Sequence, residues 1–165
     1  MKQTIFIPIK NPRIDALRKK YDTNFKKIQT HVTLVYPFEV RDQIQLKQHL
    51  DYCLKELVSF EIVFENFRKS SNYLVLDAGK NQRILLELYK KLNSGILAGF
   101  ENKDISIYLP HVTIGKFNLN EDLMMALGEM RSRGSNFKVL VNKIILATLN
   151  EDGSVKKVED IPLKA

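Results

Sequence analysis

The sequence predicts an α+β fold made of two pseudo-symmetric lobes around a central cleft. Helical and strand-like hydrophobic patterns alternate along the 165 residues. A tetrapeptide beginning His-Val-Thr occurs at 31–34 and again at 111–114, each time inside a strand-like pattern. We therefore expect residues 1–165 to form a single domain of two duplicated lobes, each a small, mostly antiparallel sheet backed by helices.

The composition narrows the class of protein. With 44% hydrophobic and 27% charged residues, the chain lies in the ordinary globular range. The first ten residues lack a signal-peptide cleavage pattern, and no apolar run reaches membrane-spanning length, so no membrane association is expected. The single Cys53 indicates a reducing compartment, and we expect a cytoplasmic location. A net charge of +7 favours partners that carry phosphate, and no obligate protein partner is inferred.

The first part of the chain is predicted to run strand, helix, motif strand, helix. Pro12 is well placed to open the first helix, because the first helical position needs no N–H. Asp42 is a good cap for the second helix. Pro37 is expected to end the motif strand. The expected elements are strands at 4–9 and 28–36 and helices at 13–21 and 42–58.

The rest of the chain repeats this order. Strands at 60–65 and 73–76 are expected to pair through a polar turn at 69–72. A helix starts about ten residues after each motif histidine, and the next strand begins at Phe60 in one half and at Phe137 in the other. We interpret this as an internal duplication. The remaining expected elements are helices at 81–97 and 121–130, the motif strand at 107–115, and strands at 137–141, 144–149 and 155–158.

The repeated motif predicts a shared site. Along a strand, residues two apart point to the same face, so His31 and Thr33 project together while Val32 points into the core. The same alternation applies to His111 and Thr113. An approximate two-fold relation between the lobes would bring two imidazoles and two hydroxyls face to face.

Such a site is suited to phosphodiester chemistry. An imidazole with a pKa of about 6.5 exists in both protonation states near neutral pH, so one histidine can act as base and the other as acid. Thr33 and Thr113 would donate hydrogen bonds to the non-bridging phosphate oxygens. This chemistry requires no metal and no cofactor. The sequence leaves open which histidine is the base and which the acid.

Other interpretations of these residues are weaker. A single His-x-Thr on a strand is most often an ordinary surface or core-edge feature, and the duplication at equivalent positions is what argues for a site. Neither copy carries His-x-His or Glu-x-x-His, so metal ligation is not expected. Cys53 lies on the apolar stripe of a helix, where thiols are usually inert, and His49 at the edge of that stripe is interpreted as structural or solvated.

The pair HVTL and HVTI resembles the two His-x-Thr/Ser-x motifs of the two-histidine (2H) phosphoesterase superfamily. Bacterial and archaeal RNA 2′,3′-cyclic phosphodiesterases, also called 2′-5′ RNA ligases, belong to it. The resemblance extends over almost the whole chain in length, element order and motif separation. It implies a bilobal α+β fold with an open cleft, catalysis by His31 and His111, and phosphate binding by Thr33 and Thr113.

The resemblance also suggests further substrate contacts. Some bacterial members carry an arginine five residues after the second motif histidine. Here that position is Lys116, which is basic but cannot make a planar bidentate phosphate contact, and which is either a phosphate-steering or a solvated residue. The corresponding position in the first half is Tyr36. Phe6, Tyr36, Phe38 and Tyr108 are candidates to stack on a base, although core packing is the commoner role of such residues.

The predicted function is metal-independent opening of 2′,3′-cyclic phosphates, or related cyclic nucleotide phosphates, at nucleotide or RNA ends. The expected partner is accordingly a small phosphodiester substrate or an RNA terminus. Two alternatives stay open. The first keeps the site but acts as a 2′-5′ RNA ligase or phosphodiesterase, or on an ADP-ribose cyclic phosphate or oligoadenylate. The second is a module that binds RNA ends without turnover.

Overall fold

A single antiparallel sheet dominates the computed structural model, which describes residues 1–79, 82–102, 107–134 and 136–165. Its strands are β1 (Gln3–Pro8), β2 (His31–Phe38), β3 (Phe60–Ser70), β4 (Tyr73–Ala78), β5 (His111–Lys116), β6 (Phe137–Val141), β7 (Lys143–Leu149) and β8 (Val155–Pro162). In space they follow the order β6-β3-β4-β5-β2-β1-β7-β8. Every pairing between these strands is antiparallel.

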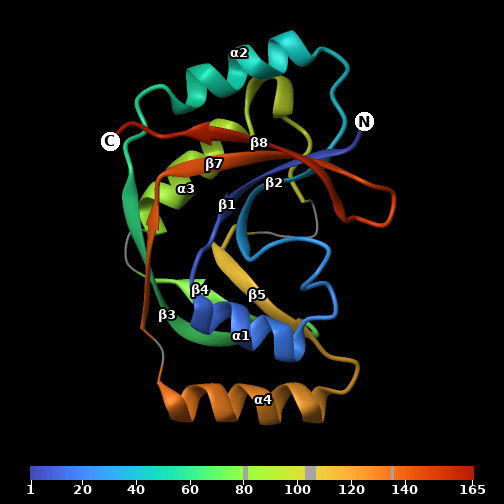
Figure 1. Ribbon diagram of the computed structural model, residues 1–165, viewed down its shortest axis with the longest axis vertical. Helices are drawn as coiled ribbons and strands as arrows, with labels where there is room; N and C mark the ends of the chain where they lie inside the picture. The colour runs from blue at the N-terminus through green and yellow to red at the C-terminus, as the bar shows by residue number, and fades with distance from the viewer. Residues whose placement is uncertain (80–81, 103–106, 135) are drawn as a thin grey trace.

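The helices lie around the sheet, two of them at the ends of the molecule (Figure 1). They are α1 (Pro12–Tyr21), α2 (Gln43–Leu54), α3 (Gln82–Leu92), the short 3-10 helix η1 (Gly95–Leu97) and α4 (Asn120–Arg133). Figure 1 shows α2 and α4 at opposite ends of the long axis. The predicted α+β class is confirmed. None of the helices in the described residues is long and apolar enough to cross a membrane.

The sheet consists of two four-stranded halves that meet at the motif strands. β2, β1, β7 and β8 form one half, and β5, β4, β3 and β6 form the other. The pairing of Val32 with Val112 joins β2 to β5. Helix α1 connects β1 to β2 but packs on β5, and α3 connects β4 to β5 but packs on β2. Each connecting helix therefore ties the two halves together.

The spatial repeat differs from the predicted one at its last strand. β1 and β4 occupy equivalent places beside the two motif strands. The strands that begin at Phe60 and Phe137, however, are β3 and β6, which pair with each other in one half. After α2 the chain crosses from the half of the sheet that contains β2 to the half that contains β5. After α4 it stays in the half that contains β5. The neighbour of β1 that corresponds to β3 is therefore β7. The half with β1 and β2 is assembled from both ends of the chain, and the half with β4 and β5 from its middle.

Local signals account for the helix starts. The Asn11 side chain accepts hydrogen bonds from the backbone N–H groups of Arg13 and Ile14, and Pro12 fills the position after it. The side chain of Asp42 accepts from the N–H of Gln45 at 2.9 Å. Both predicted starts are confirmed, although α2 ends at Leu54 rather than near residue 58.

Several predicted boundaries are wrong. Pro37 does not end β2, because Tyr36 and Pro37 both lie opposite Thr4 in a bulge, where a missing N–H is tolerated. β3 extends to Ser70 and leaves a tight turn in which Ser71 has a φ of 54°. The helix predicted at 81–97 is divided into α3 and η1, and its predicted first residue, Asn81, lies outside the described residues.

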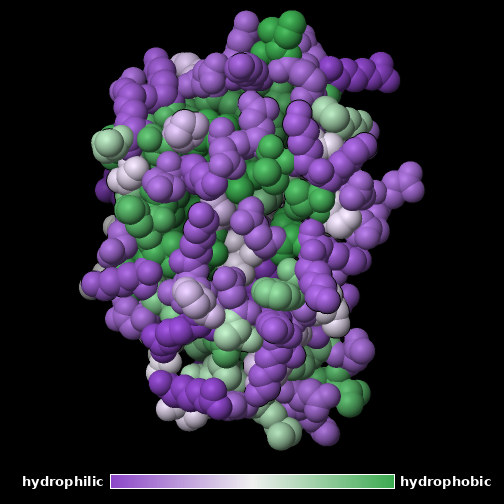
Figure 2. Space-filling view, in the orientation of Figure 1, coloured by the Kyte–Doolittle hydropathy of each residue, from purple (hydrophilic) through white to green (hydrophobic). Residues whose placement is uncertain are grey.

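The core lies between the sheet and the helices. The motif strands contribute five fully buried side chains to it, those of Val32, Leu34, Val35, Val112 and Ile114. A second, smaller cluster of Phe6, Ile145 and Ala147 lies apart from this core. Figure 2 shows that hydrophilic side chains cover most of the visible face, with hydrophobic ones showing between them near the centre.

Candidate active site

The two motif strands place their polar residues on one face of the sheet. Val32 and Val112 pair directly and are fully buried, so the residues on either side of each valine point away from the core. All of these flanking residues are half-buried. The antiparallel register sets two histidine–threonine pairs side by side across the strands, namely His31 with Thr113 and His111 with Thr33.

A hollow of about 190 Å³ opens at this face. It contains one polar residue from each motif, His31 and Thr113. His111 and Thr33 lie beside it on the same strands. The complete lining is Arg18, Asp22, Asn24, Ile28, His31, Tyr73 and Thr113. The structure therefore brings the two motifs together, and it adds residues from α1, from the α1–β2 loop and from β4.

Both histidines are held in the same way. Nδ1 of His31 lies 2.7 Å from the carbonyl oxygen of Gln29, and Nδ1 of His111 lies 2.7 Å from that of Leu109. A carbonyl oxygen only accepts hydrogen bonds, so each Nδ1 carries the proton of the neutral ring. Nε2 of each ring is left to accept or donate a proton.

Burial keeps both imidazoles neutral in the free protein. It lowers the pKa of His31 to about 4, and the positive charges of Arg18 and His111 add to this effect. Burial also lowers the pKa of His111, and nearby Arg68 acts in the same direction, whereas the carboxylate of Asp77 opposes the shift. The two rings come from neighbouring strands, each one residue away from the Val32–Val112 pair.

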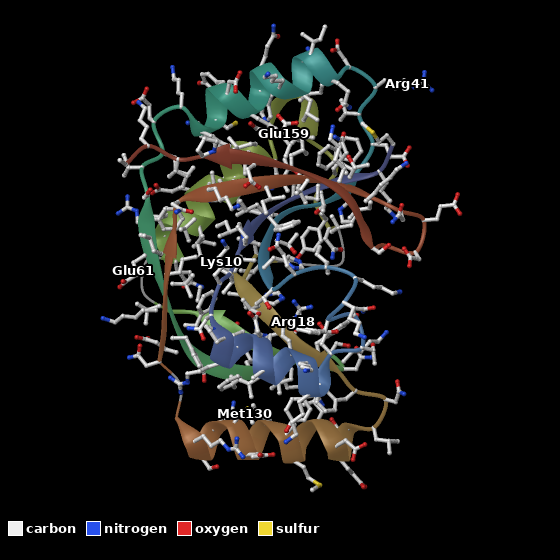
Figure 3. All side chains as sticks on the ribbon, in the orientation of Figure 1. Lys10, Arg18, Arg41, Glu61, Met130 and Glu159 are labelled. Carbon is white, nitrogen blue, oxygen red and sulfur yellow. The ribbon has the colours of Figure 1, made fainter. Side chains whose placement is uncertain are left out.

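Arg18 is a site residue that the sequence interpretation missed. It is 2% exposed, and its guanidinium donates to Oδ2 of Asp22 at 2.5 and 3.0 Å. Nη1 donates to the Ile28 carbonyl at 3.2 Å and to Oγ1 of Thr30 at 3.1 Å. Figure 3 labels Arg18 on α1. The sequence did offer a signal for Arg18. It lies four residues after Ile14 and four before Asp22, and this helical spacing puts all three residues on one side of α1.

A second arginine–aspartate pair lies near His111. Nε and Nη2 of Arg68 donate to the two carboxylate oxygens of Asp77 at 2.7 and 2.8 Å. Asp77 is the direct partner of His111 in the β4–β5 register. No sequence signal identifies this pair, because it depends on the hairpin register of β3 and β4 and on the pairing of β4 with β5.

The two phenylalanines proposed to stack on a base are buried. Phe6 is 0% and Phe38 is 2% exposed, so neither ring is available to a ligand. The Phe6 ring instead packs against the imidazole of His31, with ring centroids 4.9 Å apart. Phe6 therefore supports the histidine from within the protein.

The two tyrosines proposed for the same role also lie outside the lining of the hollow. The hydroxyl of Tyr108 donates to the Thr33 carbonyl at 2.7 Å, and its ring stacks on Tyr89 at 3.8 Å. Burial raises the pKa of the Tyr108 hydroxyl, and the same cause raises the pKa of Tyr36, which is half-buried nearby. Tyr108 thus links the segment before β5 to β2.

Lys116 lies at the edge of the site. It is exposed and pairs with Tyr73 across the β4–β5 ladder, and its Nζ is 5.7 Å from the centroid of the Tyr73 ring. Tyr73 lines the hollow and is the aromatic residue that the sequence interpretation missed. Nothing distinguished it in the sequence from the other tyrosines.

Cys53 and His49 have structural surroundings. Sγ of Cys53 donates to the Lys91 carbonyl at 3.3 Å, and burial raises the pKa of its thiol. Nε2 of His49 lies 3.0 Å from the carbonyl oxygen of Leu92, at the end of α3. Across the part of the chain that the structure describes, no group of three histidine, cysteine or carboxylate side chains is placed to hold a metal ion.

Comparison with known proteins identifies the family. The family model described as "2'-5' RNA ligase superfamily" matches residues 7–153. Relatives from Geobacillus sp. (strain WCH70) and Bacillus licheniformis, both named "Putative phosphoesterase", are each 30% identical to the chain. The aligned regions cover 85% of this chain and 82% or 83% of theirs.

Solved structures share the fold. TT0787 of Thermus thermophilus superposes with a TM-score of 0.58 at 15% identity, and the match covers 100% of both chains. LigT of E. coli superposes with a TM-score of 0.55 at 15% identity, covering 99% of each chain. With a family model that matches most of its length and relatives at 30% identity, this chain belongs to the 2′-5′ RNA ligase superfamily of two-histidine phosphoesterases.

Proposed function

We propose that this protein is a phosphoesterase that opens 2′,3′-cyclic phosphates at nucleotide or RNA ends. The observation that carries this proposal is the pairing of the two His-Val-Thr strands at Val32 and Val112, which puts two imidazoles and two threonines on one face. Family membership supports phosphoester chemistry. The net charge of +7 favours an anionic substrate.

The proposed reaction needs one proton acceptor and one donor. Neutral Nε2 of one histidine takes a proton from water, whose oxygen attacks phosphorus. The bond from phosphorus to one ribose oxygen breaks, and the protonated second histidine gives its proton to that oxygen. Thr33 and Thr113 donate hydrogen bonds to the non-bridging oxygens, whose negative charge grows toward the transition state. The products are a phosphomonoester and the restored ribose hydroxyl.

Substrate binding completes the acid. Both imidazoles have a lowered pKa in the free protein, so the donor is uncharged before substrate arrives. A bound phosphate anion favours the charged imidazolium and raises the pKa of the ring beside it. We therefore propose that the acid takes up its proton as the substrate enters.

The proposal includes independence from metal ions. The two histidines account for both proton transfers, and the threonine hydroxyls face the same side to bind phosphate oxygens. The described residues also hold no cluster of metal-ligating side chains. Structures of the same fold support a small phosphate-bearing ligand, since E. coli LigT has been crystallised with phosphate and with 3′-AMP, and Kluyveromyces marxianus Usb1 with uridine monophosphate.

Steady-state kinetics on 2′,3′-cyclic AMP test the proposal. His31→Ala and His111→Ala should each lower kcat/KM by roughly 100-fold or more, because each removes one proton transfer. His49→Gln serves as the control, since His49 lies in α2, contacts the end of α3 and is outside the site, and the variant should keep its activity. Activity should persist in EDTA. Loss of activity in EDTA with recovery on adding zinc would contradict the metal-free reaction.

The same site supports a second candidate, the joining or cleavage of 2′-5′ RNA linkages. The description of the matched family favours it, and in the reverse direction the two histidines would exchange roles. A 2′-5′-linked dinucleotide and an RNA oligomer with a cyclic phosphate end should be assayed in parallel. Turnover of the cyclic end alone supports hydrolysis. Salt-dependent binding of RNA ends without turnover of either substrate supports a binding module.

A further inference from the structure

Besides His31, Thr113 and the buried Arg18–Asp22 pair, three residues line the hollow. They are Tyr73 at the start of β4, and Asn24 and Ile28 in the loop between α1 and β2. Tyr73 is 37% exposed, so part of its ring is open to a ligand. Ile28 is partly buried against the cluster that contains Phe6. The hollow thus has an aromatic residue from one half of the sheet and an apolar loop residue that packs against the other half.

Tyr73 lies at a suitable distance from the phosphate-binding threonine. Val75 pairs with Thr113 in the β4–β5 ladder, and Tyr73 lies two residues along β4 from Val75. Two residues of a strand span about 7 Å. In a nucleoside 2′,3′-cyclic phosphate, the ribose separates the phosphorus from the centre of the base by a comparable length. A phosphate at Thr113 would therefore place the base of a nucleotide at Tyr73.

The surroundings of Tyr73 and Asn24 suit a nucleobase. Nζ of Lys116 lies 5.7 Å from the centroid of the Tyr73 ring, so a positive charge accompanies the aromatic face. The Asn24 side-chain amide makes no hydrogen bond within the described residues, although its backbone carbonyl accepts from Lys27 and Ile28. A free amide offers both a donor and an acceptor to the edge of a base.

We propose that the hollow is a nucleobase slot in which the base stacks on Tyr73 and meets the Asn24 amide at its edge. This rests on the proposed function, and it names the two side chains that would select nucleoside cyclic phosphates and RNA ends over cyclic phosphates of other polyols. Stacking suits any base, because every base has a π face. The aromatic contact comes from Tyr73 and not from the buried rings of Phe6 and Phe38.

Kinetics on two substrates test the slot. One is 2′,3′-cyclic AMP, and the other is methyl ribofuranoside 2,3-cyclic phosphate, which has no base. Tyr73→Leu should lower kcat/KM on the nucleotide roughly 10- to 100-fold, mostly through KM, and leave the base-free substrate nearly unaffected. Tyr73→Phe keeps the ring and should retain activity. Tyr52→Leu is a matched control, because Tyr52 is also exposed and has the ammonium groups of Lys55 and Lys91 near its ring.

The outcomes distinguish failure of the proposed nucleobase slot from failure of the proposed function. An equal loss on both substrates, or no loss on the nucleotide, would overturn the slot while leaving the proposed function intact. If the wild-type protein cleaves neither substrate, calorimetry with 3′-AMP and with methyl ribofuranoside 3-phosphate still decides the matter. Tyr73→Leu should then weaken binding of 3′-AMP alone. Equal binding of 3′-AMP to both proteins would count against the slot.

Discussion

At the scale of single residues, the site depends on two histidines with matched supports and unequal neighbours. Each ring is fixed by a 2.7 Å contact to the carbonyl two residues before it. His31 also packs on the buried ring of Phe6 and lies near the cation of Arg18, whereas His111 has the carboxylate of Asp77 beside it. The sequence repeat is therefore symmetric in the motif but not in its electrostatic environment.

The low pKa of His31 predicts an acid-sensitive fold. Its pKa is about 4 when folded and about 6.5 when unfolded, so the unfolded chain binds the proton more tightly. His31 contributes no pH dependence above pH 6.5. As the pH falls from about 6.5 to about 4, its contribution should lower the unfolding free energy by up to about 3 kcal/mol.

Urea unfolding of the wild type and of His31→Gln across this pH range measures the effect. The variant cannot titrate at position 31, so its stability should fall less than that of the wild type on acidification. The difference between the two proteins cancels the contributions of other titrating groups. Parallel curves for the two proteins would mean that His31 is protonated in the folded state near its ordinary pKa.

At the scale of elements, the packing of α1 on β5 requires a residue without a side chain. A Cβ at Gly115 would lie 2.5 Å from the carbonyl oxygen of Tyr21 and 2.7 Å from its Cβ. These are atoms at the end of α1, not the flexible tip of a side chain. The close approach helps set α1, and with it Arg18 and the α1–β2 loop, against the second motif strand.

Gly115→Ala should therefore destabilise the protein by roughly 1–3 kcal/mol, because the helix must move off the strand. Gly128→Ala is the matched control. Gly128 lies inside α4, and a Cβ there would meet nothing within 4 Å, so alanine should stabilise the helix by about 0.5–1 kcal/mol. Thermal and denaturant unfolding measure the stability of the two variants relative to the wild type. A neutral Gly115→Ala variant would show that α1 adjusts without cost.

At the scale of the whole molecule, the active face depends on how two four-stranded halves meet. The pairing of Val32 with Val112 joins them, and the Tyr108 hydroxyl adds a hydrogen bond to the Thr33 carbonyl near the same junction. The two motifs lie in different halves, so any shift between the halves separates histidine from threonine. The junction therefore joins the sheet and sets the spacing of the two proposed catalytic motifs.

Tyr108→Phe tests this link, because it removes the hydroxyl and keeps the ring stacked on Tyr89. It removes the hydroxyl that donates to the part-buried Thr33 carbonyl, and the unfolding free energy should fall by about 1 kcal/mol. kcat should fall as well if the junction sets the geometry of the site. Tyr89→Phe is the control, since the Tyr89 hydroxyl makes no hydrogen bond within the described residues. Equal losses of stability and of kcat in the two variants would contradict a role of the Tyr108 hydroxyl in holding the junction.

The sequence by itself determined the α+β class, the helix starts at Asn11–Pro12 and at Asp42, and the alternation that buries Val32 and Val112. These features are local, since caps and the period of two along a strand act within a few residues. The repeated motif also made the family recognisable and nominated His31, His111, Thr33 and Thr113, whose proposed catalytic and phosphate-binding roles await the kinetic tests.

Only the tertiary structure decided the rest. It paired β3 with β6, buried Phe6 behind His31, set Arg18–Asp22 and Arg68–Asp77 near the two histidines, and put Tyr73 at the hollow. These relations join strands and helices that are far apart in the chain. They follow from how the strands are distributed between the two halves of the sheet, and a pattern read within a few residues carries no information about that distribution.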